Sequence, residues 1–324
     1  MAQKQDKIKT AALLINMGGP ENLSEVRGFI RRLFSDPHII RMPQPMRGIL
    51  SAIMAYTRAP KVRKHYQLIG GSSPLKKWTS RQAELVSDRL SVEAEAMPVA
   101  VAYSYSQPSV LQAMEALTQD GIENIIAVPL YPHFSDATLG SIYADIDFAG
   151  RRLRIMDRIK TIRPFYDDPR YIRSSADMLN LALPKVDRAR KFRVIFSAHA
   201  LPQSFIDKGD PYRQQVEKTV SLICEQVPLN DWVLSFQSKI GPVKWMQPST
   251  IETVKQAAED GITQIVIMSI GFVCDHVETL YELDIELAAI AREAGIKTSI
   301  RAGVFNDYPP FANMLASLIR EAIS

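Results

Sequence analysis

The densest group of side chains that could do chemistry is a run of acidic residues in the last fifth of the sequence. Glu278, Glu282 and Glu286 recur at steps of four, so on a helix their carboxylates would share one face. Like charges at this spacing destabilise a helix by roughly a few tenths of a kcal/mol per pair unless a cation neutralises them. A solvated acidic face is the ordinary explanation. Because this run directly follows an apolar stretch and begins beside Asp275 and His276, it would also suit a divalent cation or a proton path.

The second candidate for chemistry is His199, which lies between an apolar stretch ending at Ser197 and a turn at Pro202. A histidine held against a proline turn can act as a fixed base, and neutral imidazole is also a good ligand for iron, zinc or copper. His133 and His276 follow apolar stretches in the same way. Any one of them could be a surface or capping histidine. Three at strand ends favour a shared site, because ligands gather at the carboxyl ends of strands in open α/β sheets.

The composition argues against several classes of function. With 39 Lys and Arg against 35 Asp and Glu, the net charge of +4 is too mild to predict nucleic-acid binding. The sequence has no G-x-S-x-G elbow of a serine hydrolase, and its Gly-Gly pairs match neither a dinucleotide fingerprint nor a phosphate-binding loop. The two cysteines, Cys224 and Cys274, form neither a disulfide framework nor a C-x-x-C pair. We therefore expect a reduced, cytoplasmic compartment.

Short apolar, β-branched stretches alternate with longer amphipathic ones along the chain, and apolar residues in the amphipathic stretches recur at steps of three and four. Strands that are nearly continuous in apolar residues are buried on both faces, which predicts parallel sheets with helices on each side. The sequence therefore predicts an α/β fold. The predicted strands are Ala11–Met17, Val99–Tyr105, Asn124–Tyr131, Ile159–Pro164, Phe192–Ser197, Trp232–Gln237, Gln264–Val273 and Thr298–Val304.

An internal repeat predicts two similar halves. When the chain is shifted by 140 positions, Gln-Pro-Ser at 107–109 falls on 247–249, and Asp-Gly-Ile at 120–122 falls on 260–262. Each copy is typical of a serine-capped helix that ends at Asp-Gly and leads into a buried strand. We expect one domain over residues 1–158 and a second over residues 159–324, with the last helix packing back on the first domain.

No segment is long and apolar enough to predict a membrane span, since Ile265–Cys274 has about half the required length. The first apolar run is too short for a signal peptide, so none is expected. One segment could lie on a membrane surface: Ile39–Tyr56 is rich in Ile, Met and Leu and runs into a basic stretch. An ordinary solvated amphipathic helix is the alternative. We call residues 39–66 the lip.

Five motifs occur in order over nearly the whole chain: Leu14–Pro20, Ile69–Pro74, Ser197–Pro202, Gln237–Lys239 and Asp275–Asp284. Together they resemble the motifs of the ferrochelatase family, whose members insert ferrous iron into a porphyrin in haem synthesis. The resemblance implies two Rossmann-like, chelatase-type domains, each a parallel sheet flanked by helices, with the active-site cleft between them.

The same resemblance assigns roles to the residues with chemical potential. It implies that His199 and Glu278 are catalytic and face each other across the cleft, in contact with the metal and the porphyrin nitrogens. Glu282 and Glu286 would continue an acidic line for metal or protons, on a helix that in the family carries a π-type widening. Asp275 and His276 would support Glu278 from behind.

Porphyrin-binding residues follow from the resemblance in the same way. The lip would collect a greasy substrate from a membrane surface. One departure is Ser104, where many members have Arg before the tyrosine, which leaves room for a shifted substrate preference. Residues that match the cleft mouth, the pocket wall or a strand end beside the cleft are Arg58, Lys61, Tyr66, Ser73, Met17, Tyr105, Trp245 and His133.

The function implied by the resemblance is insertion of Fe²⁺ into protoporphyrin IX with release of two protons, by a protein in the cytoplasm or on the periphery of its membrane. Fe²⁺ is then a substrate, and no prosthetic group is expected. Since no cysteine follows Cys274, no [2Fe–2S] cluster is expected either. The alternatives are a chelatase for another metal or tetrapyrrole, such as cobalt, nickel or coproporphyrin, and a tetrapyrrole carrier without catalysis.

Overall fold

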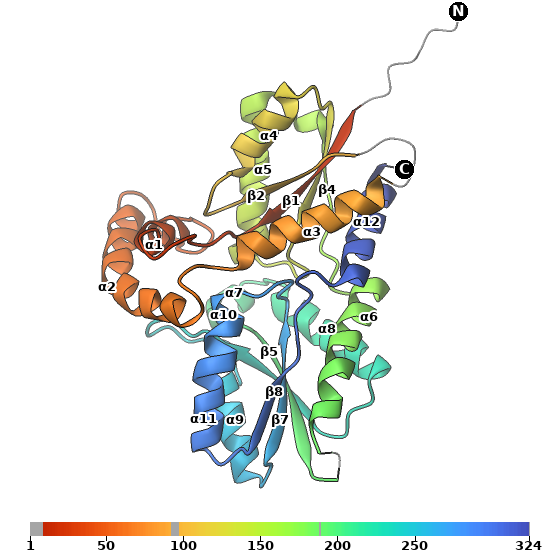
Figure 1. Ribbon diagram of the computed structural model, residues 1–324. Helices are drawn as coiled ribbons and strands as arrows, with labels where there is room; N and C mark the ends of the chain where they lie inside the picture. The colour runs from red at the N-terminus through yellow and green to blue at the C-terminus, as the bar shows by residue number, and fades with distance from the viewer. Residues whose placement is uncertain (1–8, 92–96, 188, 324) are drawn as a thin grey trace, which may run out of the picture.

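Two parallel sheets of four strands each form the frame of the computed structural model, which describes residues 9–91, 97–187 and 189–323 (Figure 1). The eight predicted strands are confirmed, each within a few residues of its expected ends. The first sheet has the order β2-β1-β3-β4, with β1 Thr10–Asn16, β2 Val99–Tyr103, β3 Asn124–Pro129 and β4 Ile159–Thr161. The second has the order β6-β5-β7-β8, with β5 Phe192–His199, β6 Trp232–Gln237, β7 Gln264–Ile270 and β8 Thr298–Arg301.

Helices cover both faces of each sheet, which confirms the α/β fold class. In the first half they are α1 Val26–Phe34, α2 Met46–Leu68, α3 Leu75–Leu90, α4 Val110–Gln119, the π-helix η1 Asp136–Gly140, α5 Ser141–Leu153 and the short η2 Met156–Arg158. Later in the chain they are α6 Pro169–Ala182, η3 Leu183–Lys185, α7 Gln203–Ile206, α8 Tyr212–Gln226, α9 Thr250–Glu259, α10 Val277–Leu280, the π-helix η4 Glu282–Leu287, α11 Ala288–Glu293 and α12 Pro309–Ile323.

The continuous apolar strands explain the layers. Along β1, Leu13 and Ile15 pack with residues of α4 and α5, whereas Ala12 and Leu14 point to the other face and join a cluster that includes α3 and α12. Every residue of β7 is buried. Because side chains alternate across a strand, burial on both faces requires apolar residues at successive positions, as the sequence shows.

The 140-residue repeat is confirmed by its local geometry. Ser109 accepts a hydrogen bond from the backbone N–H of Gln112 at 3.3 Å, and Ser249 accepts one from that of Glu252 at 3.4 Å, so both copies begin with a serine cap. Both helices end before a glycine with positive φ, +78° at 121 and +77° at 261. The sheets also share one strand order, because β2-β1-β3-β4 and β6-β5-β7-β8 correspond position by position.

The two halves share a core. One hydrophobic cluster contains Leu14 and Val128 of the first sheet together with Phe196 and Val266 of the second. The last helix, α12, packs against α3 of the first half, where Arg89 Nε donates to Asn313 Oδ1 at 2.5 Å (Figure 1). The helices between the sheets therefore belong to both halves.

The division into domains stays a prediction, but its boundary between residues 158 and 159 falls awkwardly at β4. Residues of β4 pair in parallel with β3, Ile159 opposite Ile125, so this strand belongs to the first sheet. The predicted boundary assigned this strand to the second half, although the 140-residue offset places Ile159 on Ser299 of β8, the corresponding edge strand of the second sheet. Residues 1–8, on which the expectation about a signal peptide partly depends, lie outside the described part of the chain.

The lip contains one long helix that projects from the first sheet with α1 (Figure 1). The predicted amphipathic segment Ile39–Tyr56 is helical only from Met46, because the prolines at 43 and 45 hold the preceding residues in turns. Four apolar side chains on one side of the helix, Met46, Ile49, Ile53 and Tyr56, are 54–68% exposed. Among the described residues, no helix meets the length and apolarity required to cross a membrane.

The shared core can be tested at Phe311 of α12, which is fully buried and stacks on Phe305 with ring centroids 4.4 Å apart. Phe311→Ala should lower the free energy of unfolding by about 3–5 kcal/mol, because it leaves a cavity in a packed core. Leu181→Ala, at a side chain on α6 that is 63% exposed, should change it by less than about 0.5 kcal/mol. Urea unfolding followed by circular dichroism measures both, and equal midpoint shifts would contradict the packing.

Candidate active site

A histidine and a glutamate meet where two neighbouring strands of the second sheet end. His199 is the last residue of β5, and Glu278 lies in the first turn of α10, shortly after β7. His199 Nδ1 is 2.7 Å from Glu278 Oε2. The side chains are 33% and 16% exposed, so the pair is reachable yet largely withdrawn from water. Since β5 and β7 pair in parallel, their carboxyl ends bring these residues together across 79 positions of sequence.

His276 and Asp275 lie behind this pair in different ways. His276 Nε2 is 3.8 Å from Glu278 Oε2, and its Nδ1 lies 3.2 Å from the carbonyl oxygen of Cys274. Asp275 instead accepts a hydrogen bond from Thr279 Oγ1 at 2.8 Å. His276 therefore flanks the reactive carboxylate, whereas Asp275 holds the start of the helix that carries it.

The end of β6 supplies two further polar groups for which the sequence reasoning gave no role. Gln237 Nε2 donates to the backbone carbonyl of Glu278 at 3.1 Å and lies 3.4 Å from Glu282 Oε2. Ser238 Oγ donates a hydrogen bond to the same Glu282 oxygen. Ser238 has a φ of +68°, a conformation uncommon for serine, and it allows the hydroxyl to face the glutamate. The signal in the sequence that could have identified these two residues is the position of the Gln-Ser-Lys motif at the end of a predicted strand.

The acidic row follows a π-helix, as the family resemblance implies. The backbone N–H of Glu286 donates to the carbonyl of Tyr281, five residues earlier, at 2.9 Å. A π-turn adds one residue per turn, so Glu286 is rotated away from the place it would have on a regular α-helix. The widening therefore changes the position of Glu286 around the helix relative to Glu278 and Glu282.

The first two carboxylates of the row have opposite electrostatic environments. Burial would raise the pKa of Glu278, but the nearby His199 and His276 hold that pKa well below its usual range. Burial and the charge of Glu278 raise the pKa of Glu282 to about 7, against the hydrogen bond from Ser238. Near neutral pH, Glu278 is ionised while Glu282 is poised to gain or lose a proton.

The pKa of His199 is shifted upward, in the opposite direction to the pKa of Glu278. Burial alone would lower the pKa of His199, but the charge of Glu278 and the hydrogen bond to it outweigh burial and raise that pKa. In neutral His199, a proton on Nδ1 satisfies the contact with Glu278 and leaves the lone pair on Nε2. No hydrogen bond to Nε2 is found within the described part of the chain. This nitrogen can therefore accept a proton or bind a metal ion.

The lip closes over the acidic row. The rings of His65 on α2 and Tyr281 stack with centroids 3.7 Å apart and planes 12° apart. Arg58, half-buried, lies near enough to Glu282 for the two charges to interact. Lys61 is exposed one turn further along the helix. These contacts bring the predicted basic residues to the edge of the site.

Two predicted residues of the cleft mouth lie deeper than the basic ones. Tyr66 is only 3% exposed and Ser73 is also buried. Burial, and then the charge of Glu278, raises the pKa of Tyr66, and a hydrogen bond with Ser73 opposes this. The structure therefore brings Tyr66, Ser73 and Glu278 into one neighbourhood.

Three residues predicted for the pocket wall have mixed placements. Met17 packs partly buried against the shared core, and its carbonyl accepts from the backbone N–H of Tyr105 at 3.0 Å. The hydroxyl of Tyr105 is engaged elsewhere, since it donates to Asp36 Oδ2 at 2.6 Å. Trp245 is partly buried beside Pro202, and its indole N–H has no hydrogen-bond partner in the structure. Of the three, Trp245 retains a free donor.

His133 is not brought to the pair. Its side chain is 3% exposed, and Nε2 lies 2.9 Å from Thr219 Oγ1, amid the rings of Tyr166, Tyr171 and Tyr212. Burial lowers the pKa of His133 to about 3, so it is neutral. It has no open face for a ligand in this structure, and its assignment to porphyrin binding stays a prediction.

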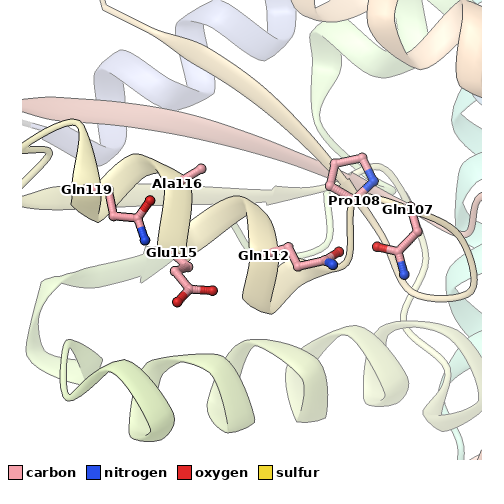
Figure 2. Close-up of a pocket in the computed structure, with 6 residues that line it drawn as sticks. All are labelled: Gln107, Pro108, Gln112, Glu115, Ala116 and Gln119. Atoms are coloured by element: carbon pink, nitrogen blue, oxygen red, sulfur yellow. The ribbon is translucent and has the colours of Figure 1, made fainter.

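Cavities elsewhere on the molecule contain little of this chemistry. One hollow of about 540 Å³ lies along α4 and contains no predicted site residue; its lining residues, from Gln107 to Gln119, are drawn in Figure 2. A second, of about 430 Å³, lies between α1 and α5 beside Ser104 and Tyr105. Over the described ranges, no three His, Cys, Asp or Glu side chains converge on a metal position.

Comparison with known proteins identifies relatives of this chain. A model of the Ferrochelatase family matches residues 9–323. The ferrochelatase of Geotalea daltonii is 38% identical over 313 residues, covering 96% of this chain and 97% of the relative. That of Aquifex aeolicus is 36% identical over 317 residues, covering 98% of this chain and all of the relative.

Solved structures show the same fold at much lower identity. SirB from Bacillus subtilis with Fe³⁺ is 15% identical and has a TM-score of 0.57, covering 97% of this chain and 95% of its own. CbiX, described as the terminal enzyme for biosynthesis of sirohaem in denitrifying bacteria, is 14% identical with a TM-score of 0.54, covering 97% and 100%. At these identities the likeness concerns the fold alone.

The coupling of the pair can be measured directly on the His199 imidazole. In the wild-type chain its pKa should lie above the ordinary value for histidine, and in Glu278→Gln it should be lower than in wild type, because only the charge of Glu282 then opposes burial. Titration by ¹H–¹⁵N NMR measures both values, with His133, which should stay neutral throughout, as the internal control. The same His199 pKa in both proteins would show that the two groups are not coupled.

Proposed function

Since the chain belongs to the ferrochelatase family, we propose that it inserts Fe²⁺ into a porphyrin and releases the two inner N–H protons. The observation that carries this proposal is the His199–Glu278 contact of 2.7 Å, next to a second carboxylate whose pKa is about 7. Metal insertion needs groups that take protons and groups that bind a divalent cation in the same place. Fe²⁺ is a substrate, and the proposal includes no prosthetic group.

We assign the proton chemistry to His199. Its Nε2 takes a pyrrole proton, and Glu278 stabilises the imidazolium through Nδ1. Proton loss makes the porphyrin nitrogens available to the metal, so each Fe²⁺ bound is balanced by two protons released. A cleft that bends the macrocycle would expose the nitrogen lone pairs and lower the barrier further.

We assign the outward path to Glu282 and Glu286. A carboxyl group with a pKa of about 7 changes protonation near neutral pH with little driving force, which suits a relay. When ionised, the same oxygens are ligands for a divalent cation. The row therefore serves either the leaving protons or the entering iron, and both uses require Glu282 to be ionised.

The cleft mouth supports an anionic macrocycle as substrate. Arg58 and Lys61 carry positive charge at the edge of the site, and Tyr66 and Ser73 lie deeper, in the neighbourhood of Glu278. Cationic side chains at this edge would pair with propionate groups. We propose protoporphyrin IX as the porphyrin, and coproporphyrin, with four propionates, as the alternative to test. Ser104 bears on this choice, because it removes the positive charge that many relatives have there.

We further propose that the protein is cytoplasmic and works at the surface of the cytoplasmic membrane. The exposed apolar side chains of α2 form a stripe that precedes the basic residues 58–64. Such a helix can place its apolar side in the interface while its cations meet anionic headgroups.

The assay that tests the proposed function combines the purified protein with Fe²⁺, Co²⁺ or Zn²⁺ and with protoporphyrin IX or coproporphyrin, followed by absorbance. Fastest insertion of Fe²⁺ into protoporphyrin IX supports the proposal. Preference for another metal or for coproporphyrin would indicate a different chelatase. Stoichiometric porphyrin binding with no insertion of any metal would indicate a carrier.

The assignment of the base predicts a specific loss. His199→Ala should reduce iron insertion to background while porphyrin binding, measured by fluorescence quenching, changes less than about threefold, because the base contributes to the reaction and not to the apolar contacts. His38→Ala, at a partly exposed histidine paired with Asp136, serves as the control and should retain its rate. Near-normal turnover by the His199 variant would refute the assignment.

The membrane proposal predicts a separate loss. The combined substitutions Ile49→Asp, Leu50→Asp and Ile53→Asp should lower the partition of the protein to vesicles of anionic phospholipid by about 10-fold or more. Charged groups would then replace apolar ones on the side of α2 that is proposed to enter the membrane interface. Leu181→Asp, at an exposed residue of α6, is the matched control. Insertion of iron into a porphyrin presented in detergent should stay unchanged. Equal partition of variant and wild type would contradict the surface role of the lip.

A further inference from the structure

The segment Val277–Leu287, which carries the carboxylate row, has few features of its own that stabilise its conformation. α10 has four residues, and the π-helix η4 follows it. π-Helices are rare and short because their hydrogen-bond geometry is less favourable than that of an α-helix. Five acidic residues lie between positions 275 and 286, and their charges repel one another. A cation from another element would stabilise this arrangement.

Arg301, the last residue of β8, supplies such a cation. Its Nε donates to Asp284 Oδ1 at 2.6 Å and its Nη2 to Asp284 Oδ2 at 2.9 Å, so the guanidinium binds this carboxylate in a bidentate manner. The same Nη2 is 3.1 Å from Asp275 Oδ1. The Arg301 side chain is 14% exposed, so solvent screens these contacts only weakly.

Asp275, which precedes Glu278 in the chain, is itself held by further hydrogen bonds. Asp275 accepts from Thr279 Oγ1 at 2.8 Å and from Asn306 Nδ2 at 2.7 Å, and its backbone N–H donates to Asn306 Oδ1 at 2.8 Å. Thr279 is fully buried and is the residue after Glu278. The strand β8 and the loop after it therefore anchor the chain on both sides of Glu278.

We propose that Arg301 is a positioning residue for metal insertion. By joining Asp275 to Asp284, it fixes the segment between them so that Glu278 stays against His199 and Glu282 keeps its place in the row. The inference rests on the proposed function for its kinetic test. Arg301 has no contact with His199 or Glu278 within the described ranges, so it acts through the two aspartates.

Charge and geometry can be separated by the choice of substitution. Arg301→Lys keeps the positive charge but replaces the planar guanidinium with a compact ammonium group. The ammonium cannot bind Asp284 in a bidentate manner and contact Asp275 at the same time. Asp284→Asn keeps the shape of the side chain and removes the charge that faces the guanidinium. Arg81, exposed on α3 and paired with Glu84, offers a matched arginine outside this network.

The kinetic experiment compares Arg301→Gln, Arg301→Lys, Asp284→Asn and the control Arg81→Gln. Arg301→Gln should lower kcat for iron insertion by about 10- to 100-fold, as expected when reacting groups are misplaced by about an ångström, while porphyrin affinity changes less than about twofold. Arg301→Lys should recover part of kcat, and the control should match wild type. An unchanged kcat in Arg301→Gln would overturn the proposal.

Amide hydrogen exchange tests the same proposal without activity. In Arg301→Gln, amides of residues 277–287 should exchange about 10-fold faster or more, whereas those of α12 should keep the wild-type rate. Acceleration spread equally over the chain would mean a general loss of stability and would overturn the positioning role. If wild type inserts no metal, the proposed function fails, and this exchange comparison still decides whether Arg301 holds the segment.

Discussion

The contact between His199 and Glu278 is the constraint on which the rest of the site depends. A charge that is partly withdrawn from water is costly unless an opposite charge and hydrogen bonds compensate it. The Glu278 carboxylate obtains both from two histidines, His199 at the end of β5 and His276, which follows β7. The parallel pairing of β5 with β7 is therefore what makes an ionised glutamate tolerable at this position.

Ionised Glu278 in turn determines the state of its neighbours. Its charge raises the pKa of His199, which prepares a base, and also raises the pKa of Glu282 to about 7, so that Glu282 changes protonation near neutral pH. Two carboxylates one helical turn apart thus acquire different roles from their surroundings. The proposed insertion of iron uses this difference, because protons must leave the porphyrin as the metal enters.

The fold was predictable because its signals are local. Nearly continuous apolar stretches identified the strands, and the repeated serine cap and Asp-Gly exit identified the two halves. The exception was β4, which the predicted domain boundary assigned to the second half although it pairs with β3 in the first sheet.

The site was predictable only in part. The resemblance assigned His199 and Glu278, but hydrogen bonds between distant positions leave no pattern in one sequence, so the roles of Gln237, Ser238 and Arg301 were missed. The burial of His133 could not be predicted from the sequence either. His133 follows a strand as His199 and His276 do, yet its side chain lies within a cluster of tyrosines.

The most direct test of the account is the pH dependence of iron insertion by wild type and by Glu282→Gln. Glutamine imitates the protonated carboxyl group, so the two proteins should have similar rates below about pH 6, where Glu282 is protonated. Above about pH 7.5, the variant should be slower by about 10-fold, because only the wild-type side chain ionises, with a pKa of about 7. A ratio of the two rates that is independent of pH would contradict the claim that the two carboxylates have different protonation states.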